Sequence, residues 1–144
     1  MDVHIQSRDG AEQLGSAALL AAFDDLMVSE YTLEPGTEPG EPHYHANHSD
    51  AFYVLEGELE FRIEGDSVRA SAGTLVVAPR GAVHAFPVAI GGTARFLNLH
   101  APGGFDRYLR TLNEMRARGE SPDAELQEGA RPVPGLRRMS HGGA

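Results

Sequence analysis

The sequence predicts an all-β jelly roll, a barrel closed from two sheets, followed by one amphipathic helix. Residues 34–101 consist of short apolar runs separated by glycine and proline, a pattern typical of β-sandwiches and barrels. Within this region, Glu58–Glu64 alternates strictly, so that Leu59, Phe61 and Ile63 share one face of a strand. Residues 104–118 instead repeat apolar side chains at helical spacing. A two-sheet jelly roll suits many short strands because it leaves few sheet edges exposed.

Four regions are expected along the chain. They are an N-terminal arm packing on the barrel (1–33), the barrel core (34–101), a C-terminal helical segment (102–128) and a flexible tail (129–144). In the arm, the apolar run Ala17–Phe23 fits either a helix or a strand.

The barrel core divides into strands at its turn residues. The expected strands are 51–55, 58–64, 67–72, 74–78, 83–88 and 94–101. Glu56-Gly57, Gly65-Asp66 and Pro79-Arg80-Gly81 supply turns between them. In the helical segment, Gly119 is a plausible stop and Ser121-Pro122 could begin one more short helix.

Composition excludes several classes of function. The formal net charge is −9 and the isoelectric point is near 5.1, which argues against nucleic acid as a partner. The chain has no cysteine, so any metal ion must be held by His, Asp or Glu. All basic side chains are arginine, which excludes Schiff-base chemistry on a lysine. The first residues resemble no secretory signal and no apolar run would span a bilayer, so we expect a cytoplasmic protein without a membrane partner.

Histidines are concentrated in the barrel core. His43 and His45 are two residues apart, so on a strand they point to the same side, as a clamp for a divalent ion requires. Asp50 follows after a segment of loop-forming residues. His84 lies on a separate strand beyond the turn at Pro79.

Two stretches that contain these residues resemble the two motifs of the cupin family. GTEPGEPHYHANHSDAFYVLEG resembles the first, G-x5-H-x-H-x3,4-E-x6-G, and GTLVVAPRGAVHAFPV resembles the second, G-x5-P-x-G-x2-H-x3-N. The chain departs from them in having Asp50 in place of glutamate, Val88 in place of asparagine, and Gly36 one position early.

The resemblance implies a double-stranded β-helix, the jelly-roll cupin barrel, similar to small single-domain cupins of bacteria and to quercetinases. It also implies one divalent metal ion, which could be Fe, Mn, Ni, Cu or Zn. His43, His45 and His84 would then be ligands, with Asp50 as the fourth.

Other residues are candidates for catalysis and substrate binding. His48 is expected in a solvent-exposed loop, although it could replace Asp50 as a ligand or act as a base. His100 shares a strand face with Asn98 and offers a polar group to a substrate if that face points inward. Residue parity places Phe52, Val54 and Phe86 on the metal side, where with Asn98 they would line a pocket for a small molecule.

These features favour a metal-dependent enzyme that acts on a small organic molecule, with a dioxygenase-like oxidoreductase as the first hypothesis. The alternatives are a redox-neutral isomerase, lyase or cyclase, in which the ion stabilises an enolate, and a noncatalytic ligand-binding barrel. Cupins commonly pair through sheet edges, so the resemblance also implies a homodimer.

Overall fold

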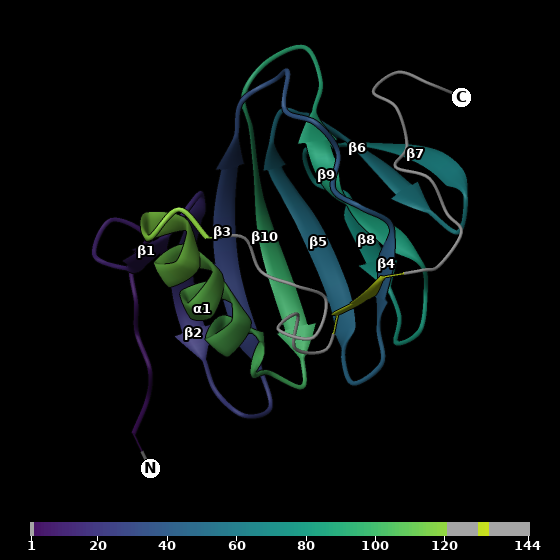
Figure 1. Ribbon diagram of the computed structural model, residues 1–144. Coiled ribbons are helices and arrows are strands. Elements are labelled where there is room, and N and C mark those ends of the chain that lie inside the picture. The colour runs from purple at the N-terminus through teal and green to yellow at the C-terminus, as the bar shows by residue number, and fades with distance from the viewer. Residues whose placement is uncertain (1, 121–129, 133–144) are drawn as a thin grey trace.

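Two β-sheets face each other in the computed structural model, which describes residues 2–120 and 130–132 (Figure 1). The six-stranded sheet has the order β1 (Glu12–Leu14), β2 (Ala17–Ala22), β3 (Met27–Leu33), β10 (Ala94–Ala101), β5 (Ser49–Glu56) and β8 (Leu75–Ala78). The five-stranded sheet has the order β11 (Ala130–Pro132), β4 (His43–His45), β9 (His84–Ala89), β6 (Glu58–Ile63) and β7 (Asp66–Ser71). Neighbouring strands run antiparallel, and helix α1 (Phe105–Ala117) follows β10. The predicted all-β jelly roll with a C-terminal helix is therefore confirmed.

The N-terminal region differs from the arm that the sequence suggested. Residues 12–33 form β1, β2 and β3, and β3 pairs with β10 along its whole length. Strands β1, β2 and β3 therefore belong to the same six-stranded sheet as β10, β5 and β8 of the barrel, and no structural boundary falls at position 33. The ambiguous run that begins at Ala17 is a strand rather than a helix.

The C-terminal region is described only in part. Residues 130–132, which fall in the predicted flexible tail, form β11 beside β4. The short helix predicted at Ser121-Pro122 lies outside the described residues.

Apolar side chains from both sheets fill the space between them. Phe52, Val54, Leu59, Phe61 and Phe96 are all at most 1% exposed. Their positions follow from alternation, since every second side chain of a strand points to the same face.

Strand β10 shows the same alternation with polar residues at its far end. Phe96, Asn98 and His100 are buried, whereas Leu97 and Leu99 are only partly buried. The His100 face of this strand therefore points into the barrel.

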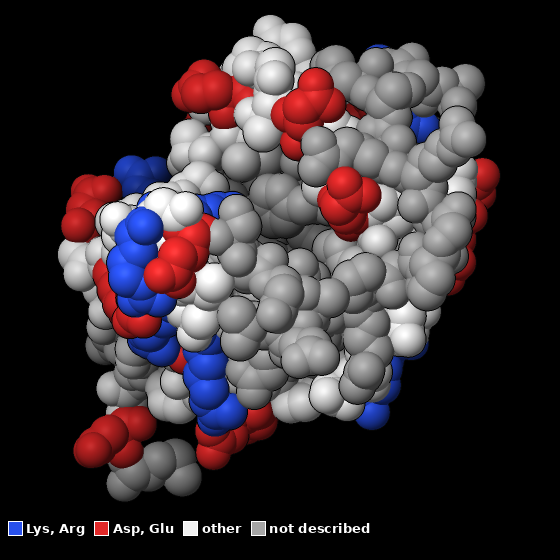
Figure 2. All heavy atoms as spheres, in the orientation of Figure 1, with Lys and Arg blue, Asp and Glu red and all other residues white. Residues whose placement is uncertain are grey.

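Helix α1 packs on the N-terminal strands. Phe105 and Leu109 contact a small apolar cluster of Leu14, Leu19 and Met27. Arg110 extends the attachment, since its Nη2 lies 3.0 Å from Oε1 of Glu12. Acidic and basic side chains lie together over this helix on the face shown in Figure 2. Among the described residues, no helix is both long and apolar enough to cross a membrane.

Gly57, between β5 and β6, is under a stronger constraint than the turn glycine Gly65. Gly57 has φ of +77°, and a Cβ there would lie 2.5 Å from the carbonyl oxygen of Thr93. Gly65 has a similar φ of +83°, but a Cβ there would meet nothing within 4 Å. Gly57, the last glycine of the first motif, is thus required by a close backbone contact as well as by its dihedral angles.

We expect Gly57→Ala to lower the free energy of unfolding by about 3 kcal/mol or more, because it adds a backbone clash to the left-handed strain. Gly65→Ala is the matched control and should cost only the strain of about 1–2 kcal/mol. Urea unfolding of the two variants checks this, and equal losses would contradict it.

Candidate metal centre

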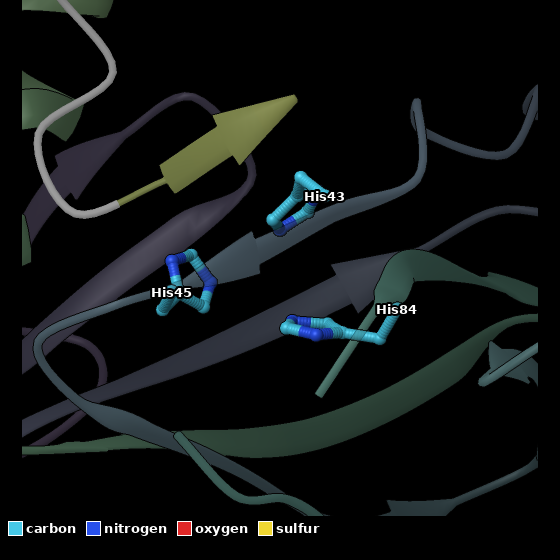
Figure 3. Close-up of side chains that lie close together, drawn as sticks. All are labelled: His43, His45 and His84. Atoms are coloured by element: carbon cyan, nitrogen blue, oxygen red, sulfur yellow. The ribbon is translucent and has the colours of Figure 1, made fainter. Parts of the chain in front are cut away.

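Three histidines from the five-stranded sheet converge on one point. His43 and His45 lie on β4, and His84 begins β9, where it pairs directly with His43. Figure 3 shows the three rings turned toward one another, and one ring nitrogen of each lies within 4.8 Å of the others. We call these residues the first triad. The chain therefore has histidines positioned to bind a metal ion.

Two of these rings are held in the tautomer that presents the Nε2 lone pair to a metal ion. Nδ1 of His43 lies 2.9 Å from the carbonyl oxygen of Glu41, and Nδ1 of His84 lies 2.9 Å from that of Ala82. A carbonyl oxygen can only accept, so each Nδ1 carries a proton and donates it. The lone pair of the neutral ring is then on Nε2. A backbone carbonyl that holds the second ring nitrogen is the usual partner of a metal-ligating histidine.

The carboxylate of Asp50 lies beside this triad. Its Oδ2 is 3.2 Å from Nε2 of His84 and 3.3 Å from Nε2 of His45. Its Oδ1 is 3.0 Å from Nε2 of His100, which pairs with Asp50 across β5 and β10. The short loop before β5 turns the chain so that Asp50 meets residues of both sheets.

The contact between His84 and Asp50 requires a proton or a cation between the two groups. Because Nδ1 of His84 already donates to Ala82, a neutral ring would present its Nε2 lone pair to a carboxylate oxygen. Two acceptors at 3.2 Å repel each other unless a proton or a metal ion lies at Nε2. This donor set therefore fits a divalent cation.

The pKa values of this pair agree with that reading. Burial lowers the pKa of His84, but the hydrogen bond and the charge of Asp50 outweigh it, so the pKa is raised. Burial alone would raise the pKa of Asp50, but the charge and hydrogen bonds of His100, His45 and His84 hold it well below its usual range. The Asp50 carboxylate therefore stabilises a positive charge at His84.

Asn98, predicted to line a substrate pocket, is a partner of Asp50. Its Nδ2 donates to Oδ1 of Asp50 and, at 3.0 Å, to the carbonyl oxygen of Ala51. Asn98 is 4% exposed, so its amide is committed to orienting the carboxylate.

His48 is buried, which corrects the expectation of a solvent-exposed loop residue. It is 5% exposed and its ring stacks on His45 with centroids 4.1 Å apart. His100, 3% exposed, lies 4.5 Å from it between ring centroids. One nitrogen from each of His45, His48 and His100 lies within 4.8 Å of the others, and we call these residues the second triad.

Phe105, at the start of helix α1, covers this group. Its ring packs edge-on against His45, His48 and His100, with centroids 5.4, 5.5 and 4.7 Å apart. Sequence reasoning placed Phe105 only in a packing stripe. Its spacing within the helix gave no signal of contact with the histidines, since that contact depends on where the helix folds back.

The three residues predicted to form an apolar wall belong to the hydrophobic core or pack against it. Phe52 and Val54 are fully buried in the core, and Phe86 packs against that core from β9. Phe52 reaches the site most directly, with its ring 6.4 Å from that of His84. Outside the site, His4 is exposed and bonds to the carbonyl oxygen of Leu20.

Two histidines are kept neutral by their surroundings. Burial, followed by the charge of His84, lowers the pKa of His43 to about 4. Burial, followed by the charges of His100 and His45, lowers the pKa of His48 to about 3. Both rings are therefore unprotonated near neutral pH, the form that binds metal ions.

The metal-free protein should lose stability as the pH falls from about 6.5 toward 3, and His48 should contribute to the loss. Its folded pKa lies below that of the unfolded chain, so in this window the unfolded state binds more protons. Replacing it by His48→Gln should reduce the fall in melting temperature between pH 7 and pH 4.5, measured with a chelator present. His4→Gln is the control, and an unchanged fall in His48→Gln would contradict the assignment.

Comparison with known proteins places this geometry in a family. The model of the cupin domain matches residues 29–100, half of the chain. A quercetin 2,3-dioxygenase of Bacillus subtilis is 29% identical over 72 residues, which are 50% of this chain but only 21% of that protein.

Solved structures of other proteins are similar to this chain as well. The structure of KdgF from a Halomonas species has a TM-score of 0.57 and 31% identity, covering 62% of this chain and 82% of that one. An RmlC-like cupin from Shewanella frigidimarina shares the fold, with a TM-score of 0.63 and 23% identity over 73% of this chain and 96% of that one. The chain thus belongs to the cupin family.

Proposed function

We propose that this cupin is a metal-dependent enzyme acting on a small organic molecule, with dioxygenase-like oxidoreductase chemistry. His43, His45 and His84 would hold the ion, with Asp50 as the fourth ligand or as the carboxylate that orients the others. The similarity to quercetin 2,3-dioxygenase, although it spans a small part of that protein, supports the choice of reaction.

The observation that carries the proposal is the state of the ring nitrogens. The backbone carbonyls of Glu41 and Ala82 hold two rings with Nε2 free to bind, and the Asp50 carboxylate faces His84 as though a cation lay at Nε2. Histidine and carboxylate donors suit Fe, Mn, Ni, Cu and Zn. A redox-active ion bound there would supply the electron-transfer chemistry that oxygenation requires.

His100 is the better candidate for a catalytic base. Its ring is positioned by Oδ1 of Asp50, so it can hold a proton beside the first triad. The pKa of about 3, caused mainly by burial, makes His48 a weak base in the metal-free protein. Phe52, Val54 and Phe86 would form the apolar side of the substrate pocket, with Asn98 holding the carboxylate at its rim.

Metal analysis of the untagged protein, followed by reconstitution, tests the proposal. We expect at least one equivalent of Fe, Mn, Ni, Cu or Zn, and oxygen consumption with a phenolic or enolisable substrate after loading with a redox-active ion. His43→Ala/His84→Ala should abolish this consumption because both substitutions remove ligands of the first triad. His4→Ala, a change outside the site, should leave it intact.

Two results would argue against this function. A wild-type protein that stays metal-free after reconstitution would leave a ligand-binding barrel. Substrate turnover without oxygen consumption would instead indicate isomerase, lyase or cyclase chemistry.

The contribution of the Asp50 charge to metal binding can be measured separately from that of its side-chain size. Asp50→Asn keeps the size of the side chain but removes the charge that faces the histidines, so affinity for Zn²⁺ should fall about 10–100-fold. Isothermal titration of the metal-free protein measures this, with Asp66→Asn, an exposed carboxylate on β7, as the control. An affinity unchanged in Asp50→Asn would show that the carboxylate takes no part in metal binding.

A cytoplasmic homodimer remains part of the proposal. Strand β8 is an edge of the six-stranded sheet, and its Leu75 and Val77 are 57% and 47% exposed. Pairing through a sheet edge would cover such side chains.

A further inference from the structure

We propose that the second triad, His45, His48 and His100, is a second position for a transition-metal ion beside the first. His48 and His100 occupy no ligand position of the two cupin motifs, and the proposed function above does not require them to bind metal; an ion on Nδ1 of His100 would take its lone pair, so His100 acts as a base only while the second position is empty. The two triads share His45, so they form one continuous histidine cluster with two binding positions, and a neutral His45 gives its single lone pair to an ion at one of them.

The ligand nitrogens of the second triad lie within the same distance limit as those of the first. In each, one ligand nitrogen from every ring lies within 4.8 Å of the other two. Tetrahedral coordination at about 2.0–2.1 Å places neighbouring nitrogens roughly 3.3 Å apart, so small side-chain rotations would close either triad around an ion. All three rings of the second triad are at most 5% exposed.

Two nitrogens of this triad lack a hydrogen-bond partner in the part of the chain that the structure describes. Nε2 of His48 and Nδ1 of His100 are buried and make no hydrogen bond within the described residues. A buried polar atom without a partner costs about 1–3 kcal/mol, so its presence in a folded protein calls for an explanation. His100 donates through Nε2 to Oδ1 of Asp50, which leaves the lone pair on Nδ1. A bound cation would satisfy both orphaned atoms.

Asp50 supplies the charge that two neighbouring cations need. Its Oδ2 faces His45 and His84 of the first triad, and its Oδ1 faces His100 of the second. A carboxylate between two divalent ions reduces their mutual repulsion. The same side chain would therefore serve both positions.

The surroundings indicate which ions would bind. Three imidazoles and no sulfur favour Zn, Cu, Ni or Fe over Ca or Mg. Phe105 seals the triad from the helix side. An ion there would be shielded from solvent and would exchange more slowly than one beside the partly exposed His43.

The test is to remove the ligands of the first position and to measure whether the second position still binds a metal ion. In His43→Ala/His84→Ala, the second triad is intact, so we expect about one equivalent of Co²⁺ with the absorption of a low-symmetry, nitrogen-bound ion. Adding His48→Ala to this variant should weaken Co²⁺ binding at least about 100-fold, because it removes a direct ligand. Adding His4→Ala instead should change nothing.

The proposal is overturned if folded His43→Ala/His84→Ala, checked by circular dichroism, binds no Co²⁺ at concentrations that saturate the wild type. It is also overturned if the third substitution, His48→Ala, leaves binding unchanged. Since the readout is metal binding, an absence of enzymatic turnover would bear on the proposed function alone.

A measurement on the unaltered protein covers the case in which the variants do not fold. Anomalous diffraction at the zinc edge from wild-type crystals grown with Zn²⁺ should show a peak bonded to His48 and His100, in addition to one at His43 and His84. A peak at the first triad with none at the second would refute the inference.

Discussion

The buried carboxylate of Asp50 is the interaction on which the arrangement of the site depends. An ionised carboxylate taken out of water costs several kcal/mol unless partners replace its hydration. Here histidines from β4, β9 and β10 and the amide of Asn98 take that place. Because these partners come from both sheets, the carboxylate couples the position of one sheet to the other at the end of the barrel where the histidines lie.

Because the site depends on contacts with Asp50, the hydrogen bonds that fix the orientation of the histidine rings are also important. A ring that is free to rotate would satisfy Asp50 in several ways, and the site would have no single geometry. The carbonyls of Glu41 and Ala82, each two residues before its histidine, remove that freedom for His43 and His84. The tautomer is thus set by local backbone structure in the segments just before β4 and β9, independently of any contact between the sheets.

The fold could be predicted from the sequence because its signals are local. Alternation in Glu58–Glu64 and helical spacing after Gly104 depend on neighbouring residues, and the observed β6 and α1 follow them. The first triad was accessible through motif spacing and parity. The N-terminal strands were not, since short runs such as Ala17–Ala22 carry no alternation and become strands only by pairing with β3.

The sequence named His48 and His100 as candidates but left open their contacts, which are set by register between distant strands and by packing of the helix. His100 lies opposite Asp50 because β10 pairs with β5 at that offset, and a shift by one residue would turn His100 out of the barrel. Burial of His48 likewise depends on Phe105, which arrives from the helix that follows β10. No pattern within the loop at residues 46–48 contains that information.

The register between β5 and β10 gives a physical reason for aspartate in place of glutamate at position 50. Residues opposite each other on antiparallel strands have Cβ atoms about 4.5–5.5 Å apart, so a short side chain is enough for Asp50 to reach His100. Asn98, two residues from His100, reaches the same carboxylate diagonally. Glutamate would carry the carboxylate about 1.5 Å further from its strand and so change its distance to every one of these partners. Aspartate at this position and histidine at position 100 are therefore matched, and together they give one carboxylate contact with both groups of histidines.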